Sequence, residues 1–146
     1  MRLLVQRVLS ARVDVHERAV GKIGKGLLVF FGAKKGDQEK SVSWLAEKVS
    51  NLRVFADNEG KMNLSLLDVG GEILIVSQFT LYGNCEKGRR PSFIDAMEPE
   101  SSEKLYEQFI LEVKKRCEIV QMGKFGADMQ VHLINDGPIT LIIDHD

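Results

Sequence analysis

GLLVFFG, at residues 26–32, is an unbroken apolar run bounded by two glycines. A run of this length without a polar interruption is typical of a strand covered on both faces of a sheet. ILIV at residues 73–76 is a second run of the same kind, and it leads directly into the more polar segment SQFTL at residues 77–81. The two runs predict the buried interior of a β-sheet.

Strand signals continue on both sides of these runs. Apolar and polar residues alternate over residues 11–16, which is the period of a strand with one wet face. The segment GKIGKG at residues 21–26 has no following helix, so we interpret it as a hairpin turn and not as a phosphate-binding loop. Residues 129–134 and 139–143 predict two more strands, separated by a turn at residues 135–138.

Two segments have the spacing of amphipathic helices. Asp37 is a candidate N-cap for the first, and Pro99 opens the second, since proline lacks the N–H that stays unpaired in a first turn. Apolar residues recur at intervals of three and four, as one buried helical face requires. These residues are Val42, Leu45, Ala46, Val49 and Leu52 in the first helix and Leu105, Phe109 and Val113 in the second.

Strands outnumber helices, so we predict an α+β fold in which two main helices pack on a strongly curved, barrel-like sheet. The length of 146 residues fits a single domain spanning residues 1–146. No apolar run approaches the ~20 residues that cross a bilayer, and Gln6 and Arg7 interrupt the apolar start in a way that a signal peptide would not. We therefore expect a cytoplasmic protein without a membrane contact.

Charge and metal-binding residues restrict the function further. The net charge of −1 argues against a grip on a long nucleic-acid duplex, which usually requires a basic excess, but it suits a protein that holds only the end of an RNA. The three histidines have no metal-ligand spacing, and the two cysteines, Cys85 and Cys117, form no CxxC pair. We expect no metal, no cofactor and two reduced structural thiols.

Catalytic signatures are sparse. Ser77 and His132 belong to the residue types of a catalytic triad, but no GxSxG elbow supports them. SQFTL at residues 77–81 places hydrogen-bonding side chains around one phenylalanine, as either a site or a strand running out to the surface would. NDGPIT at residues 135–140 is a turn or a place of close backbone approach, and the residues alone favour a trans Gly-Pro bond.

SQFTL at 77–81 and NDGPIT at 135–140 resemble the two signature motifs of the D-aminoacyl-tRNA deacylases. The resemblance covers essentially the whole chain. It includes QRV at 6–8, EGKMNLSL at 59–66, GRRPSF at 88–93 and FGADMQV at 125–131.

This resemblance implies a homodimeric hydrolase that cleaves the ester between a D-amino acid and the terminal adenosine of tRNA, as a form of translational proofreading. It implies a cis Gly137-Pro138 bond that projects from one subunit into the pocket of the other. The catalytic segment would be Ser77, Gln78, Phe79 and Thr80. The adenosine pocket would be Phe125, Ala127 and Met129, with Arg7 and Asn135 in supporting positions and Arg89 and Arg90 near RNA phosphate.

A selectivity mechanism follows from this resemblance. Rigid backbone placed where an L side chain would point rejects L-amino acids by clash and leaves a D side chain free. Glycine has no side chain to reject, so we expect glycyl-tRNA to be cleaved as well. Backbone N–H groups near Phe79 and Thr80 would bind the oxyanion. The 2′-hydroxyl of the ribose, and not Thr80, would assist the attacking water.

Two alternatives use the same residues differently. A non-catalytic dimer that binds a nucleoside or the end of tRNA would need Phe125 and Met129 but not the Gly-Pro segment. A structural or assembly protein would use Gly137-Pro138 as a turn in a dimer interface.

Overall fold

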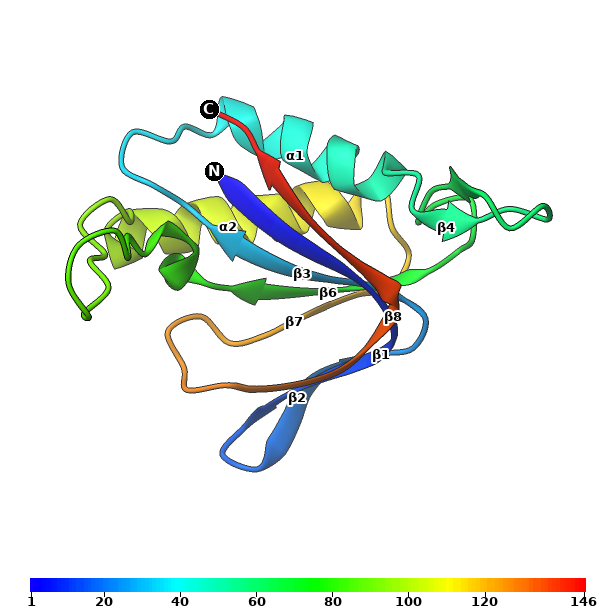
Figure 1. Cartoon of the computed structure of the whole chain (residues 1–146), viewed down its shortest axis with the longest axis horizontal. Helices are drawn as coiled ribbons and strands as arrows, with labels where there is room; N and C mark the ends of the chain where they lie inside the picture. The colour runs from blue at the N-terminus through cyan, green and yellow to red at the C-terminus, as the bar shows by residue number, and fades with distance from the viewer.

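A six-stranded mixed sheet curves until it nearly closes into a barrel, and two helices pack against it (Figure 1). The predicted α+β class and curved sheet are confirmed. The computed structural model describes residues 1–146. In chain order the elements are β1 (Arg2–Val15), β2 (Arg18–Ile23), β3 (Gly26–Gly32), α1 (Lys40–Asn51), β4 (Phe55–Ala56), β5 (Met62–Leu64), β6 (Glu72–Ser77), the 3-10 helix η1 (Phe79–Tyr82), α2 (Pro99–Lys114), β7 (Val120–Met122) and β8 (Gln130–Asp144).

The two apolar runs form the middle of the sheet, as predicted. β3 and β6 pair in parallel, from Gly26 beside Glu72 to Phe31 beside Ser77. β7 extends the parallel part beyond β6, and β1 pairs antiparallel with β3 on the other side. β3 is buried along nearly its whole length. β6 therefore lies inside the sheet, and its carboxyl end delivers the segment that starts at Ser77.

The segment GKIGKG is not the hairpin turn that we expected. β2 and β3 both pair antiparallel with β1, and the register is continuous from the end of β2 into β3: Ile23 lies beside Ala11 and Gly26 beside Val8. The chain therefore keeps its direction through Gly24 and Lys25. The hairpin lies earlier, at His16 and Glu17, where both residues have positive φ.

β8 pairs with the other edge of β1 and contains the predicted turn as a bulge. Gln6 lies beside Thr140 and Val8 lies beside Asn135. The four β8 residues 136–139 thus lie opposite a single β1 residue, Arg7. The two strands pair on both sides of this segment. The prediction of two strands separated by a turn is therefore wrong: the segment is one long strand with a four-residue bulge.

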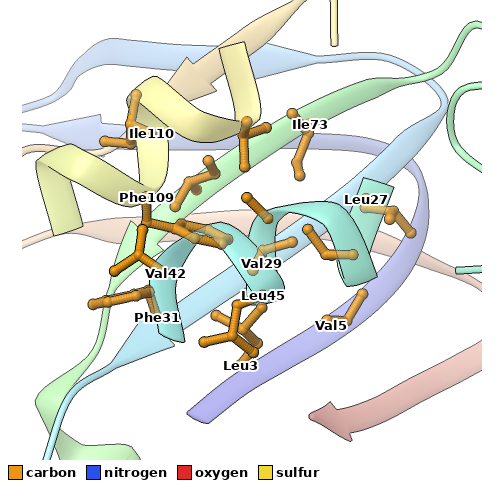
Figure 2. Packing of buried hydrophobic residues seen from close by; sticks show 14 of the residues in the cluster. Leu3, Val5, Leu27, Val29, Phe31, Val42, Leu45, Ile73, Phe109 and Ile110 are labelled. Carbon is orange, nitrogen blue, oxygen red and sulfur yellow. The ribbon is translucent and has the colours of Figure 1, made fainter. Parts of the chain in front are cut away.

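α1 and α2 cover one face of the sheet and close the main core (Figures 1 and 2). The predicted apolar faces are the buried ones, with Leu45 and Phe109 packing toward Val29. Asp37 is not the N-cap of α1, because that position is held by Glu39 without a side-chain cap. The Asp37 carboxylate instead accepts the Lys34 N–H (2.7 Å) and lies 2.8 Å from the Met1 amino group.

The cysteines differ in their environments. Cys117 is buried with its sulfur 3.5 Å from the Ser50 hydroxyl, and burial raises the pKa of its thiol. Cys85 is exposed in the loop after η1, so the expectation of a structural thiol holds only for Cys117. Neither helix is long and apolar enough to span a membrane.

Gly26 provides a direct test of the parallel pairing. A Cβ added at Gly26 would lie 1.8 Å from the Glu72 carbonyl oxygen, so Gly26→Ala must separate β3 from β6. We expect it to lower the free energy of unfolding by about 3 kcal/mol or more. Urea denaturation followed by circular dichroism measures this value.

Gly24→Ala is the matched control, because the nearest atoms to its Cβ are Glu72 carboxylate oxygens at 3.9 Å. It should change stability by no more than about 0.5 kcal/mol. Equal stability of the two variants would contradict the pairing of β3 with β6.

Candidate active site

A cavity of about 640 Å³ opens at the carboxyl end of β6, a volume within the range of small-molecule sites, about 300–1,000 Å³. Ser77, Gln78 and Phe79 form one wall, and Phe125, Ala127 and Met129 form another. The structure thus brings together two segments that lie far apart in the sequence. The predicted catalytic segment and the predicted adenosine pocket face the same space.

The predicted catalytic segment runs from the end of β6 into the start of a 3-10 helix. β6 ends at Ser77, and Gln78 hydrogen-bonds through its N–H to the Phe31 carbonyl (2.7 Å). The first N–H groups of a helix have no acceptor within it, and no side chain caps η1. The N–H groups of Phe79 and Thr80 are therefore the donors that this segment presents at the end of β6.

Thr80 lies outside the cavity lining. Its hydroxyl oxygen accepts a hydrogen bond from the Gln78 side-chain amide, and no histidine or cysteine belongs to the cavity lining. His132, the other residue type of a triad, lies on β8 with Nε2 at 3.1 Å from Asp14. The structure does not bring Ser77 and His132 together.

The predicted adenosine wall begins with a turn, in which the Ala127 N–H donates to the Lys124 carbonyl (3.2 Å) and Gly126 has a φ of +69°. Residues 125, 127, 129 and 131 are half-buried and line the cavity, whereas Lys124, Asp128 and Gln130 are exposed. Phe125 also packs on Tyr106, with ring centroids 5.8 Å apart. Phe125 thus contacts both the core and the cavity.

Tyr106 connects Phe125 of this wall to β6. Its hydroxyl donates to the Ile75 carbonyl at 2.9 Å, one residue before the end of the buried part of β6. Burial raises the pKa of Tyr106 well above its ordinary value. The group therefore stays a neutral hydrogen-bond donor at all physiological pH values.

The Gly-Pro segment is built around Arg7 and Asn135. The peptide bond between Gly137 and Pro138 is cis, and Gly137 has a φ of +113°. Arg7 Nε lies 3.0 Å from Asp136 Oδ2, and its Nη1 donates to the Val54 carbonyl. A Cβ on Gly137 would lie 2.6 Å from the Arg7 guanidinium, so this position accepts only glycine without a rearrangement.

Asn135 spans the bulge. Its side-chain amide donates to the carbonyls of Arg7 (2.9 Å) and Ile139 (3.0 Å), and its oxygen accepts from the Thr140 hydroxyl (3.2 Å). The bulge is therefore held at both ends by one side chain. The supporting positions predicted for Arg7 and Asn135 are next to the Gly-Pro segment and not in the cavity.

The Gly-Pro segment does not reach the cavity within one chain. The bulge lies opposite Arg7 of β1. Arg7 is paired with Leu27 of β3, and Leu27 is paired with Ile73 of β6, which lies four residues before Ser77. At ordinary strand spacing, the segment and Ser77 are about 14 Å apart across the sheet and about 13 Å apart along it. Neither Gly137 nor Pro138 lines the cavity.

Most residues of a third cavity wall were not predicted from the sequence. Residues in and before the first turn of α2, together with Lys35, complete the cavity. Phe93 packs edge-on against Phe79, with ring centroids 5.1 Å apart. These residues lie mainly in loops without periodicity. The only sequence signal was the GRRPSF segment, which ends at Phe93.

A curved mixed sheet with two helices, and a cavity at the carboxyl end of its central parallel strand, define the fold class. A solved structure described as a probable eukaryotic D-amino acid tRNA deacylase has this fold, with a TM-score of 0.85 over 99% of this chain and 98% of the other, at 19% identity.

The chain belongs to the D-Tyr-tRNA(Tyr) deacylase family, whose model matches residues 4–144. It is 57% identical to a D-aminoacyl-tRNA deacylase of Thermosipho melanesiensis, over 99% of this chain and 97% of that protein. It is 54% identical to the protein of that name from Thermotoga petrophila, with the same coverage. A solved structure titled c-Myc DNA Unwinding Element Binding Protein is similar at a TM-score of 0.94 and 42% identity, over 100% of this chain and 99% of that one.

Proposed function

We propose that this chain hydrolyses the ester between a D-amino acid and the terminal adenosine of tRNA, acting in the cytoplasm as a homodimer of single-domain subunits. The observation that carries this proposal is the shared cavity of residues 77–79 and 125–129 in a chain of the deacylase family. Phe125 and Met129 offer an aromatic face and a thioether to a purine, and stacking of this kind contributes about 1–3 kcal/mol per base. The ester would then lie beside Phe79.

The proposed chemical step uses backbone donors and water. Water adds to the ester carbonyl carbon, and the N–H groups of Phe79 and Thr80 bind the negative charge that develops on the carbonyl oxygen. Such donors contribute about 3–4 kcal/mol in other hydrolases. The ester C–O bond then breaks, the ribose oxygen takes up a proton, and the amino acid leaves as the free acid. The family resemblance favours the neighbouring 2′-hydroxyl as the group that orients the water. The cavity lining has no histidine, and its only carboxylate is Glu98 on the α2 wall.

Selectivity is assigned to Gly137 and Pro138 of a second copy of the chain. The separation of this segment from the cavity within one chain leaves its own cavity without it. The rigid support from Arg7 and Asn135 suits a backbone group that rejects an L side chain by contact. A glycyl ester has no side chain that the backbone could reject, so the same arrangement admits glycyl-tRNA.

β8 supplies the surface on which a second copy would bind. This strand pairs only with β1, so its other edge is open. Ile134, Leu141 and Ile142 are 57%, 40% and 60% exposed along it. An open apolar edge is a pairing surface that proteins normally cover, and the bulge that carries Gly137 lies between these residues.

Hydrolysis of D-tyrosyl-, L-tyrosyl- and glycyl-tRNA by the purified protein tests the proposed function. We expect rapid loss of the D-tyrosyl and glycyl esters and at least about a hundredfold slower loss of the L-tyrosyl ester, since a clash of a few kcal/mol gives a factor of this size. Acid-gel separation of charged and uncharged tRNA measures all three. Equal D and L rates would overturn the Gly-Pro selectivity, and no turnover would favour a non-catalytic RNA-end binder.

Thr80→Ala tests the RNA-assisted step. The variant should keep at least about a tenth of kcat/KM, whereas loss of a true nucleophile in a serine hydrolase costs about 10⁶-fold. D-tyrosyl-tRNA that ends in 2′-deoxyadenosine should lose most of its turnover with the wild-type protein. An inactive Thr80→Ala next to an active Thr80→Ser, both folded as dimers, would instead make Thr80 the nucleophile.

Ile142→Glu tests the dimer. A buried charge at this edge should convert the protein to a monomer by sedimentation velocity and lower D-ester turnover at least about tenfold. Leu111→Glu is the control, since Leu111 is 59% exposed on α2 and away from β8. A monomeric Ile142→Glu protein with full activity and D selectivity would show that each cavity works alone.

A further inference from the structure

The α2 wall of the cavity contains a serine whose hydroxyl has no partner within the protein. Ser102 is 7% exposed and lines the cavity. Its backbone N–H donates to the Glu98 carbonyl at 2.9 Å, but its hydroxyl makes no hydrogen bond within the protein. The hydroxyl oxygen itself is not among the fully enclosed, unpaired polar atoms of the protein. It therefore remains accessible from the cavity and is available to a ligand there.

The beginning of α2 surrounds this hydroxyl. Glu98 and Pro99 line the cavity beside Ser102, and no side chain caps the helix. An uncapped helix of this length carries partial positive charge at its N-terminus, within the first turn. The helix terminus thus favours an anion beside the Ser102 hydroxyl, although Glu98 at the N-cap and Glu100 in the first turn oppose this effect. Glu100 pairs with Lys104 at 2.8 Å.

Lys35 supplies a full positive charge on the same cavity. Its backbone N–H donates to the Asp95 carbonyl (3.0 Å), which holds its loop against the segment before α2. Its ammonium group has no ion-pair partner, whereas the neighbouring Lys34 pairs with Asp146. Lys35 is the only cation among the lining residues, and Glu98 is the only carboxylate.

We propose that Lys35, Ser102 and the first turn of α2 form a subsite for an RNA phosphodiester, the one that links the terminal nucleoside to the nucleotide before it. This proposal rests on the proposed function. A terminal aminoacyl nucleoside has three parts: a base, an ester and a 5′-phosphodiester. Residues 125–129 and 77–79 account for the first two, and the α2 wall is the remaining side of the cavity.

The chemistry of this wall matches a phosphodiester. The serine hydroxyl donates to a phosphate oxygen, the lysine neutralises its charge, and the helix terminus adds to both effects. Glu98 works in the opposite direction, because its carboxylate repels the same phosphate. The subsite is thus a specificity device for an RNA end, with Glu98 limiting its affinity.

The test compares D-tyrosyl-tRNA with D-tyrosyl-adenosine, which has the base and the ester but no phosphodiester. The measured quantity is the ratio of kcat/KM for the two substrates. We expect Lys35→Gln to lower this ratio about tenfold, through KM, and to reduce the salt dependence of log(kcat/KM) by about 0.7, the value for one single-strand phosphate. Ser102→Ala should lower the ratio several-fold, and Glu98→Gln should raise it.

Lys34→Gln is the matched control, since it removes the same charge one residue away, outside the cavity lining, and should leave the ratio at the wild-type value. A second readout needs no turnover: by calorimetry, the wild-type protein should bind adenosine 5′-phosphate methyl ester about tenfold more tightly than adenosine, and Lys35→Gln should lose this advantage.

The outcomes separate the two proposals. An unchanged ratio in Lys35→Gln and Ser102→Ala, with D-ester turnover intact, would overturn the phosphodiester subsite and leave the proposed function standing. Equal losses on both substrates would overturn it too, since they indicate a structural role. A wild-type protein that cleaves neither substrate would remove both proposals.

Discussion

The structure depends on the pairing of β1 along both of its edges. One edge pairs with β2 and β3, with one register shift between Val13 and Asp14, and the other pairs with β8 over nearly its whole length. Side chains alternate between the two faces of a strand, so a slip of one residue would exchange the core and solvent faces. The four-residue bulge opposite Arg7 is therefore possible only because the register is fixed again on both sides of it, by Thr140 and by Asn135.

The same strand determines how the candidate site and the Gly-Pro segment are placed. β1 separates β8 from β3 and β6, and this separation keeps the Gly-Pro segment away from the cavity of its own chain. The cavity is supported independently: Tyr106 holds β6 through the Ile75 carbonyl, and Arg2 donates to the Leu81 carbonyl at the end of η1. The proposal that a second copy completes the site depends on this separation of two well-supported segments within one sheet.

Local patterns predicted the elements well where one contact face decides the structure. Residues 26–32 and 73–76 are apolar because β3 and β6 are buried on both faces, and Pro99 opens α2 because its missing N–H costs nothing there. The patterns failed where contacts with residues distant in the sequence decide the local structure. Asp37 has the composition of an N-cap, but the Met1 amino group and the Lys34 N–H hold its carboxylate. Gly26 looked like part of a turn, but its role is the close approach of the Glu72 carbonyl.

The candidate site shows the same limit. SQFTL and NDGPIT were distinctive only through the family resemblance, because nothing in a five- or six-residue segment shows what it faces. Residue spacing does not reveal that residues 125–129 lie beside Ser77, which follows from the path between β7 and β8. Lys35 and Ser102 carry no motif at all. One looks like a solvated lysine and the other like a serine on a buried helical face, and only the cavity relates them.

The proposed dimeric arrangement would explain how one site accepts many amino acids and still selects D over L. In that proposal the recognised groups are the base and its phosphodiester, which every aminoacyl-tRNA shares, so affinity would not depend on the amino acid. The backbone around the second copy's Gly-Pro segment would touch only what is attached to the α-carbon, and Arg7 and Asn135 hold that backbone in position. Because binding and rejection would use different walls, the substrate range could widen without weakening the rejection of L-amino acids. The same separation would leave the site no physical means to exclude glycine.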